Sequence, residues 1–384
     1  MAFAVSIPRI RSLPIEKLAF GGPMSTRIAI FNHKGGTGKT VSAYNIGWKL
    51  TEHGNKVLLV DGDSQVNLTA LALGFDVFDK YYEDDSTKSK NIKDGVSPVL
   101  EGKPSALEPF DCPSAANNPN LFVLPGHAEL AAYEGQISLA QETGGTLSVM
   151  KNLPGALQAF IGMIEAQHEI DYTLIDLNPG LGAINQNLFI ASDAFIVPTN
   201  PDPFSLMAVG TLGNHLVRWM NWKDANFHKF EDADYPLHAS RPVFLGTLNS
   251  RFNKHASKAA RKFDERIAQI DEQVEQRLVP TLQAAGMTAK PECYQRAFDE
   301  WKDKLAADNK GLHALARIPD FQGLIHTANL ADLPIFKLDD TALKADNIQG
   351  IVKEKAVRNI ESFDVIYEAI ASKIEMLASN DCRI

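Results

Sequence analysis

The stretch IAIFNHKGGTGKTVSAYNIGWKL, residues 28–50, constrains the fold of this chain more than any other segment. Its apolar beginning indicates a short buried strand, its glycine-rich centre a loop, and the part from Lys39 onward an amphipathic helix. Gly54 ends that helix, and the apolar segment KVLLVD at residues 56–61 predicts a second strand. A strand, helix and strand this compact form a right-handed βαβ unit with parallel strands.

Short apolar segments of the same kind recur along the chain, with helical patterns between them. Alternation of this type is typical of an α/β fold, a mostly parallel twisted sheet flanked by helices on both faces. We expect a further strand at the edge of the sheet over residues 333–338. The other predicted strands are residues 121–126, 172–177, 194–199 and 243–249.

Residues 24–384 are predicted to form a single domain, preceded by an N-terminal extension over residues 1–23. Two polar segments, residues 78–120 and 222–241, are expected to be insertions that form loops or a small subdomain. Residues 255–286 predict one long helix with an apolar stripe on one face and charges on the other. That helix is either a packed surface helix or a helix that binds a partner.

The charge and the cysteines of the chain narrow the classes of function. The net charge is −9, so non-specific binding to nucleic acid would require a local basic patch. Cys112, Cys293 and Cys382 are widely separated, which argues against a disulfide framework and against a paired-cysteine metal site. No segment has the roughly 18 consecutive apolar residues of a membrane helix. A reducing cytoplasm is the expected location.

The loop GTGKT, residues 36–40, has the composition of a phosphate-binding loop. Glycines between a strand and a helix let backbone N–H groups approach a phosphate chain, and the helix N-terminus adds partial positive charge. The Lys39 ammonium can reach the β- and γ-phosphates, and the Thr40 hydroxyl can ligate Mg²⁺. The general pattern has a glycine where His33 stands, so the match to it is imperfect.

The segment KGGTGKT, with Lys34 five residues before Lys39, resembles the deviant Walker A motif of the ParA/MinD ATPases. The resemblance implies a P-loop NTPase fold, with ATP and Mg²⁺ as cofactors. It also implies that Lys34 crosses a dimer interface to the partner's nucleotide, as an arginine finger does. The loop residues that it assigns to the nucleotide are Lys34, Gly35, Gly36, Thr37, Gly38, Lys39, Thr40 and Val41.

Two further segments resemble motifs of the same family. In DGDSQ, residues 61–65, the resemblance gives Asp63 the task of positioning the attacking water, while Asp61 supports the Mg²⁺ shell or orients the loop. A serine replaces the family's usual proline there. In YTLIDLNPG, Asp176 ends an apolar strand as a Walker B aspartate does, and is expected to hold Mg²⁺ through a water. Asn249, at a later strand end, is either an adenine-reading residue or an ordinary turn residue.

The resemblance implies an ATP-dependent dimerising ATPase of the ParA type. Such a protein positions DNA, in plasmid or chromosome partition, or another cellular cargo, and hydrolyses ATP slowly until a partner stimulates it. The implied partners are a second copy of the chain, non-specific DNA and a ParB-like or other stimulating protein. The C-terminal segment lacks the basic amphipathic character of a MinD-like membrane tail. The implied location is cytoplasmic, and nucleoid-associated if DNA is bound.

Two basic clusters are candidates for contact with DNA phosphates, although each is equally a solvated helix face. Two other functions stay open on the same fold. One is an ATP-switched signalling or defence accessory that does not bind DNA. The other is an ATP-dependent small-molecule ligase or amidase whose pocket the segment 78–120 would supply. The clusters are Arg251, Lys254, Lys258, Arg261 and Lys262, and then Lys353, Lys355 and Arg358.

Overall fold

The computed structural model describes residues 25–143, 150–252, 258–305, 311–321 and 323–383. Their strands form one eight-stranded sheet in the order β3-β4-β2-β5-β1-β6-β7-β8. Every pairing is parallel except that of β3 with β4. The strands are β1 (Thr26–Ile30), β2 (Val57–Gly62), β3 (Ser114–Ala115), β4 (Asn118–Leu124), β5 (Tyr172–Leu177), β6 (Ala194–Thr199), β7 (Val243–Phe252) and β8 (Ala314–Pro319).

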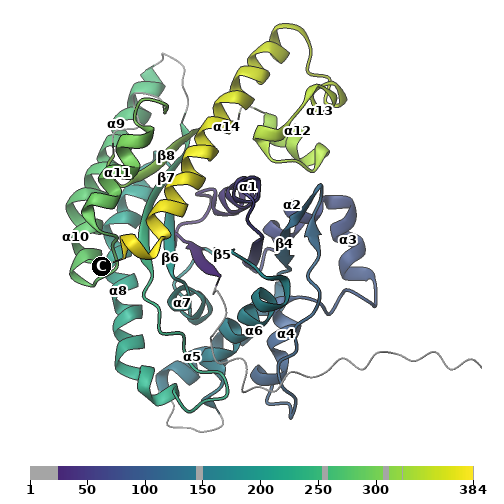
Figure 1. The fold of residues 1–384 in the computed structure, drawn as a ribbon, viewed down its shortest axis with the longest axis vertical. Helices are drawn as coiled ribbons and strands as arrows, with labels where there is room; N and C mark the ends of the chain where they lie inside the picture. The colour runs from purple at the N-terminus through teal and green to yellow at the C-terminus, as the bar shows by residue number, and fades with distance from the viewer. Residues whose placement is uncertain (1–24, 144–149, 253–257, 306–310, 322, 384) are drawn as a thin grey trace, which may run out of the picture.

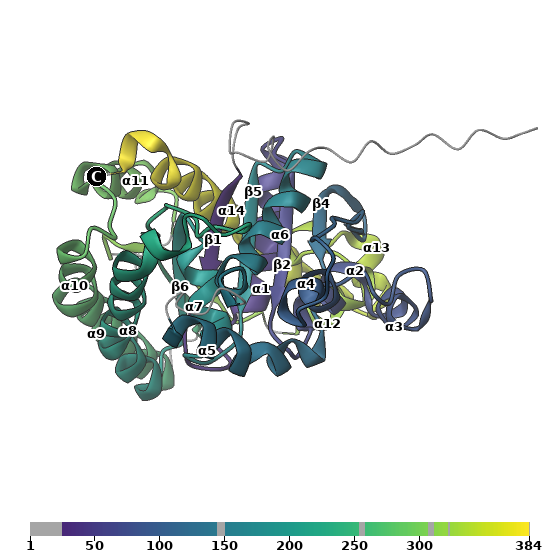
Figure 2. The same ribbon diagram turned by 90° about the horizontal axis from the view of Figure 1, so that it is seen from below.

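Helices cover both faces of this sheet (Figure 1 and Figure 2), which confirms the predicted fold class. One face carries α1 (Lys39–Glu52), α2 (Asn67–Leu73), α3 (Phe75–Glu83), α11 (Pro291–Trp301), α12 (Leu324–Ala331), α13 (Asp340–Ala345) and α14 (Gly350–Ala378). The other carries α4 (Ile92–Leu100), α5 (Glu134–Thr143), α6 (Leu153–His168), α7 (Ala183–Ile190), α8 (Pro203–Asn226), α9 (Lys258–Gln273) and α10 (Val279–Ala284).

Strand β1 lies between β5 and β6, and its side chains alternate between two apolar cores. Ile28 and Ile30 face the core under α1 and α14, whereas Ala29 faces the core under α6 and α8. This is the period of two that a buried parallel strand imposes. Both faces are covered, so Ile28, Ala29 and Ile30 are all fully buried, as expected for a buried strand, and the buried Arg27 is paired with Glu165.

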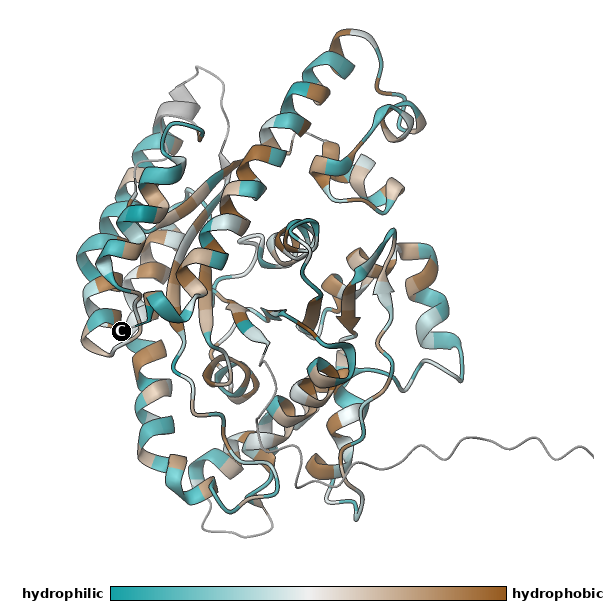
Figure 3. Ribbon diagram, in the orientation of Figure 1, coloured by the Kyte–Doolittle hydropathy of each residue, from teal (hydrophilic) through white to brown (hydrophobic). Residues whose placement is uncertain are grey.

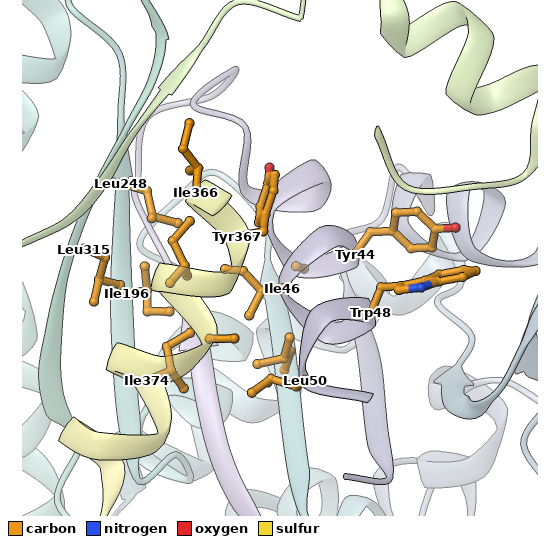
Figure 4. Close-up of a cluster of buried hydrophobic side chains, with 14 of the residues drawn as sticks. Tyr44, Ile46, Trp48, Leu50, Ile196, Leu248, Leu315, Ile366, Tyr367 and Ile374 are labelled. Atoms are coloured by element: carbon orange, nitrogen blue, oxygen red, sulfur yellow. The ribbon is translucent and has the colours of Figure 1, made fainter. Parts of the chain in front are cut away.

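Helix α14 closes the first core by packing across α1 and the end of the sheet (Figure 4). Ile366, Tyr367 and Ile374 of α14 meet Ile46 and Leu50 of α1, with Ile196, Leu248 and Leu315 of the strands beneath them. Each such buried side chain contributes roughly 1.5–3 kcal/mol relative to an exposed one. The C-terminal helix is therefore part of the domain's main core.

A polar clasp joins the last residues of α1 to α14. The two ring nitrogens of His53 lie 2.9 Å from Glu375 and 3.0 Å from Glu368. Burial works to lower the pKa of His53, but the two carboxylates outweigh burial and raise that pKa above its usual value. A protonated His53 can donate to both carboxylates, so the clasp is strongest when the imidazole is charged.

The predicted edge strand at residues 333–338 is wrong, because the structure has a 3-10 turn at Ile335–Lys337. Pro334, just before the turn, lacks the backbone N–H that a strand would use in the ladder. Ile335 and the next residue, Phe336, are both buried. Both side chains lie in the core under α1 and α14, whereas a strand would send neighbouring side chains to opposite faces of the sheet.

The expectation of no disulfide is also wrong. Cys293 of α11 and Cys382, in the 3-10 turn Asn380–Cys382, form a disulfide with a Cα–Cα distance of 5.9 Å. The two residues are 89 positions apart in the sequence, so spacing alone could not pair them. The backbone N–H of Lys290 donates to the Cys382 carbonyl at 2.9 Å, which holds the C-terminal segment against α11. Cys112 is a free, buried thiol.

The segments predicted as insertions contain regular structure. Residues 78–120 include most of α3, all of α4, β3 and the start of β4, and residues 222–241 include the 3-10 turn Phe227–Phe230. Residues 255–286 contain α9, a π-helical turn at Val274–Leu278 and α10. That these segments are insertions stays a prediction, and the expected N-terminal extension, residues 1–23, lies outside the described residues. No described helix is long and apolar enough to span a bilayer.

Candidate nucleotide-binding site

The carboxyl ends of β1, β2, β5, β6 and β7 meet at one edge of the sheet, and the glycine-rich loop follows β1 there. Gly36 and Gly38 have φ angles of 71° and 85°, a left-handed conformation that favours glycine. A Cβ at Gly36 would meet nothing within 4 Å, whereas one at Gly38 would lie 3.6 Å from the Ser250 hydroxyl. Gly38 directly precedes α1, so the loop opens onto a helix N-terminus. This is the geometry of an anion-binding nest.

Lys39 is buried beneath the loop. Its ammonium lies 3.3 Å from the carbonyl oxygens of Asn32 and Lys34. Burial lowers the pKa of Lys39, although the carboxylates of Asp176 and Asp63 work in the opposite direction. A phosphate chain in the nest would supply the anionic partner that this buried ammonium lacks among the described groups.

The Lys34 side chain has different hydrogen-bond partners from those of Lys39. Its ammonium donates to the carboxylate of Asp202 and, at 3.0 Å, to the Ser205 hydroxyl. Asp202 is the N-cap of α8 and accepts the Ser205 backbone N–H at 2.9 Å. The Lys34 side chain is therefore held toward the start of α8 within its own chain. No local pattern could predict this pairing, because Asp202 lies 168 residues from Lys34.

Asp176 and Asp61 stand side by side at the ends of β5 and β2, where they are register partners. The Thr40 hydroxyl donates to one Asp176 oxygen at 2.7 Å, and the other oxygen is buried without a hydrogen bond among the described groups. Burial, reinforced by the nearby Asp61 carboxylate, raises the pKa of Asp176 to about 8. An unsatisfied buried carboxylate beside a hydroxyl is a donor set that suits a hard cation such as Mg²⁺.

Asp61 and Asp63 have different surroundings. Asp61 accepts from the Thr69 backbone N–H at 2.8 Å and from its hydroxyl at 2.7 Å, and burial raises the pKa of Asp61 to about 6. These bonds fix Asp61 to the start of α2. The Asp63 carboxylate accepts the Gln65 backbone N–H at 3.0 Å and lies close enough to Lys39 for the two charges to interact.

Asn249 reaches the same edge at the end of β7, but both ends of its amide already have partners. The Thr199 hydroxyl donates to its carbonyl oxygen, and its amide nitrogen lies 3.2 Å from an Asp271 oxygen. The side chain is almost fully buried. Contact of Asn249 with adenine stays a prediction, and it would require one of these bonds to be exchanged.

Other residues that hold the edge together were not predicted. The Asn200 amide donates to the Gly36 carbonyl at 2.8 Å, which ties the loop to the end of β6. The Asn185 amide donates to the carbonyls of Asn178 and Gly180, at 2.9 and 3.1 Å, and so shapes the loop after Asp176. The Glu134 carboxylate accepts the first backbone N–H groups of α7. These contacts depend on tertiary structure and carry no local sequence signal.

The basic clusters are only partly covered by the structure. The side chains of residues 251–261 lie outside the described ones, so Arg251, Lys254, Lys258 and Arg261 are not placed, while Lys262 is exposed on α9. In the second cluster, Lys353 pairs with Asp340 at 2.7 Å. Lys355 and Arg358 are exposed on the first turns of α14.

The amino-acid sequence of this chain is similar to those of several known proteins. The chain is 34% identical over 185 residues to the uncharacterized protein Rv1708 of Mycobacterium tuberculosis, a match that covers 48% of this chain and 50% of Rv1708. It is 33% identical over 192 residues to the chromosome partitioning protein ParA of Caulobacter vibrioides, covering 50% and 62% respectively. The sporulation initiation inhibitor protein Soj of Bacillus subtilis is 32% identical over 191 residues, covering 50% and 64%. The chain thus spans about half to two thirds of the length of these relatives.

The fold has a counterpart among solved structures. The crystal structure of protein DIP2308 from Corynebacterium diphtheriae superimposes with a TM-score of 0.50 at 24% identity, over 65% of this chain and 88% of the other. Residues 25–227, more than half of the chain, match the AAA_31 family, described as an AAA domain. Since the family match covers more than half of the chain and the relatives ParA and Soj share the same segment, the chain belongs to the ParA/MinD family of P-loop ATPases.

Proposed function

We propose that this chain is an ATP-dependent dimerising ATPase of the ParA type, which positions DNA or another cellular cargo and hydrolyses ATP slowly until a partner stimulates it. The observation that carries the proposal is the meeting of two lysines, a threonine and a Walker B aspartate at one sheet edge. Lys34, Lys39, Thr40 and Asp176 come from β1–α1 and β5, and their positions match the motif of the family.

The residues at the carboxyl edge of the sheet would have separate roles in transfer of the γ-phosphoryl group to water. Lys39 and the backbone N–H groups of residues 35–41 bind and orient the phosphates. Thr40 and Asp176 would hold Mg²⁺, which neutralises charge on the phosphate oxygens when it is bound. Asp63, whose charge interacts with Lys39, would orient the attacking water. The hydrogen bonds of Asp61 to Thr69 favour its loop-orienting role over a direct role at the metal.

Lys34 is proposed to act in trans, on the nucleotide of a second copy. In the single chain its ammonium is paired with Asp202, so dimerisation must exchange that contact for the partner's phosphate. The first turn of α8 beside Asp202 exposes Phe204 and Met207. Large apolar side chains next to a lysine that must cross an interface are consistent with a surface that a second copy covers.

The cargo is proposed from the relatives. ParA of Caulobacter vibrioides is named a chromosome partitioning protein, and the shared segment includes the nucleotide site. Non-specific DNA is the proposed binding partner of the dimer, with Lys355 and Arg358 of α14 among the exposed cations available to its phosphates. A ParB-like or other protein is the proposed stimulator, and the cytoplasm the proposed location.

Size-exclusion chromatography tests this proposal directly. The full chain is run with ATP, with ADP and without nucleotide, each with Mg²⁺ and each repeated with non-specific duplex DNA. We expect a dimer with ATP alone, and a DNA complex that forms only with ATP and weakens as salt rises. Lys39→Ala is the matched control and should stay monomeric throughout.

Two results would contradict the proposal. A stable ATP dimer without affinity for DNA would favour an ATP-switched signalling or defence accessory. A monomer that ignores DNA and consumes ATP only with an added metabolite would favour a small-molecule ligase or amidase.

A further inference from the structure

The start of α3 and the helix α12 expose large apolar side chains on one side of the molecule. Phe75 is 53% exposed and Val77 51%, while on α12 Ile325 is 37% and Leu330 61% exposed. Figure 3 shows hydrophobic segments at the start of α3 and along α12. We call the surface formed by these four residues, with Asp76 and Asp332, the α3–α12 face. Exposed apolar side chains that gather on one side of a protein are typical of interaction sites.

The two helices that make the α3–α12 face meet directly. A Cβ at Gly74, the residue before α3, would lie 2.6 Å from an Asp332 oxygen at the end of α12. The Asn117 amide donates to the Asp332 carbonyl at 3.3 Å, so the β3–β4 turn supports the same junction. The apolar side chains of the two helices therefore flank one junction.

The α3–α12 face is acidic. Asp76 and Asp332 are close enough to interact, since burial first and then the Asp76 carboxylate raise the pKa of Asp332. Neither carboxylate has a cationic partner among the described residues. Asp79 and Glu83 continue the negative charge along α3, against which the helix supplies only Lys80. Negative charge of this density disfavours DNA and anionic lipid as the occupant, and favours a cationic one.

A small pocket beside the face has unsatisfied polar atoms. It lies between α1 and the end of α12, and its walls include Val41, Tyr44, Leu71, Ile325 and Asn329. The Tyr44 hydroxyl and the Asn329 side-chain oxygen are buried without a hydrogen bond among the described groups. Figure 4 shows Tyr44 extending from α1 with its hydroxyl outermost. Buried polar atoms without partners are costly, and a space of this size can hold a water that bonds to them.

The pocket and the nucleotide edge share one helix, α1. Val41 directly follows Thr40, and Tyr44 lies one turn further along α1. Helix α1 therefore connects this side of the molecule with the phosphate loop, and a partner that contacts α1 here could bind differently with and without nucleotide.

We propose that the α3–α12 face docks a helical segment of a partner protein that carries aliphatic side chains on one side and lysine or arginine beside them. Aliphatic side chains would cover Phe75, Val77 and Leu330, and the cations would pair with Asp76 and Asp332. The identification of this partner with the one that stimulates hydrolysis rests on the proposed function.

The test uses the full chain and a defined probe. The probe is a fluorescent leucine–lysine peptide of about five helical turns with all leucines on one face. Two control peptides carry the same residues in a scrambled order, or glutamate in place of lysine. Binding is measured by fluorescence anisotropy with ATP, with ADP and without nucleotide, and ATP binding is measured in the same samples.

The matched protein variants change the charge without disturbing the fold. Asp76→Asn/Asp332→Asn removes both carboxylates, and asparagine tolerates the left-handed backbone of Asp332 (φ 49°). Asp264→Asn/Glu265→Gln removes two exposed carboxylates from α9, on the other side of the molecule (Figure 1). We expect about tenfold weaker binding of the amphipathic basic peptide to the first variant and unchanged binding to the second. Leu330→Ser should weaken binding as well.

Several results would overturn the proposal. One is equal affinity of the wild-type chain for the amphipathic and the scrambled peptide. Another is an equal loss of peptide affinity in the two charge variants. A third is binding of duplex DNA or anionic vesicles that becomes weaker in Asp76→Asn/Asp332→Asn. Self-association of the protein that Asp76→Asn/Asp332→Asn abolishes would make the occupant a second copy, which also overturns it. Peptide binding without any ATP binding would instead refute the proposed function and leave the docking face standing.

Discussion

Replacing Asp202 with asparagine separates the two tasks of this side chain. In the single chain, Asp202 caps α8 by accepting the Ser205 backbone N–H at 2.9 Å, and it also pairs with the Lys34 ammonium. Asparagine is as good an N-cap as aspartate, so Asp202→Asn removes the ion pair and keeps the cap. Asp202→Ala removes both and is the matched comparison.

The structure sets the size of the effect. The side chains of Lys34 and Asp202 are 19% and 33% exposed, so solvent screens the pair and its contribution is about 0.5 kcal/mol. Alanine at this position should lower the free energy of unfolding by about 1 kcal/mol more, through the lost cap. A dimer in which both copies of Lys34 cross the interface breaks the pair twice. Asp202→Asn should therefore favour the ATP dimer by about 1 kcal/mol, or about fivefold in dissociation constant.

Sedimentation velocity with ATP and Mg²⁺ measures that dissociation constant, with Asp63→Ala as the background to prevent hydrolysis. A dimer that Asp202→Asn leaves unchanged or weakens would refute the competition between the cis and trans contacts of Lys34. Acid titration gives a second check. Burial opposes ionisation of Asp202, but the bond from Lys34 lowers its pKa below 3.8. Its contribution to stability is thus present at neutral pH and is lost as the pH falls through that lowered pKa, a dependence that Asp202→Asn should lack.

Four further outcomes are expected. Asp63→Ala should keep ATP binding and lower turnover by at least about 100-fold in a phosphate-release assay, and wild-type turnover would exclude it from the mechanism. Lys34→Ala should spare ATP binding by the single chain but weaken the dimer or its turnover, whereas normal values for both would remove its role in trans. Cys293→Ser should lower the free energy of unfolding by about 4 kcal/mol without reductant, by urea titration, and an unchanged midpoint would show that the bond to Cys382 does not form. His53→Gln should remove a contribution that is present below pH 6.5 and is lost as the pH rises through the raised pKa of His53, so a pH-independent difference in stability would contradict the clasp.

The core of the fold and the nucleotide loop could be predicted because their signals are local. An apolar run, a glycine-rich turn and a helical stripe fix β1, the loop and α1 within residues 26–52, and Asp176 is marked by its place at the end of an apolar strand. Parallel topology then brings the strand ends to one edge, which is why Asp61 and Asp176 lie side by side.

What the sequence could not show depends on contacts between distant segments. The Cys293–Cys382 bond requires α11 to lie against the C-terminal turn, and no sequence pattern in either segment predicts that contact. The partner of Lys34 is a helix cap that looks like any other N-cap in the sequence. The segment after Pro334 has the composition of a strand, but its neighbouring apolar side chains, Ile335 and Phe336, both pack into the core between α1 and α14. Tertiary packing overrode local preference there.

Isothermal titration of ATP into the full chain, with Mg²⁺ and then with EDTA, tests most directly whether the carboxyl edge is a nucleotide and metal site. We expect saturable binding of ATP to the wild-type chain with Mg²⁺. The affinity should fall by about tenfold or more in EDTA or in Asp176→Asn, and Lys39→Ala should show no measurable binding. ATP binding that is equally tight in Lys39→Ala, or no binding to the wild-type chain at all, would contradict it.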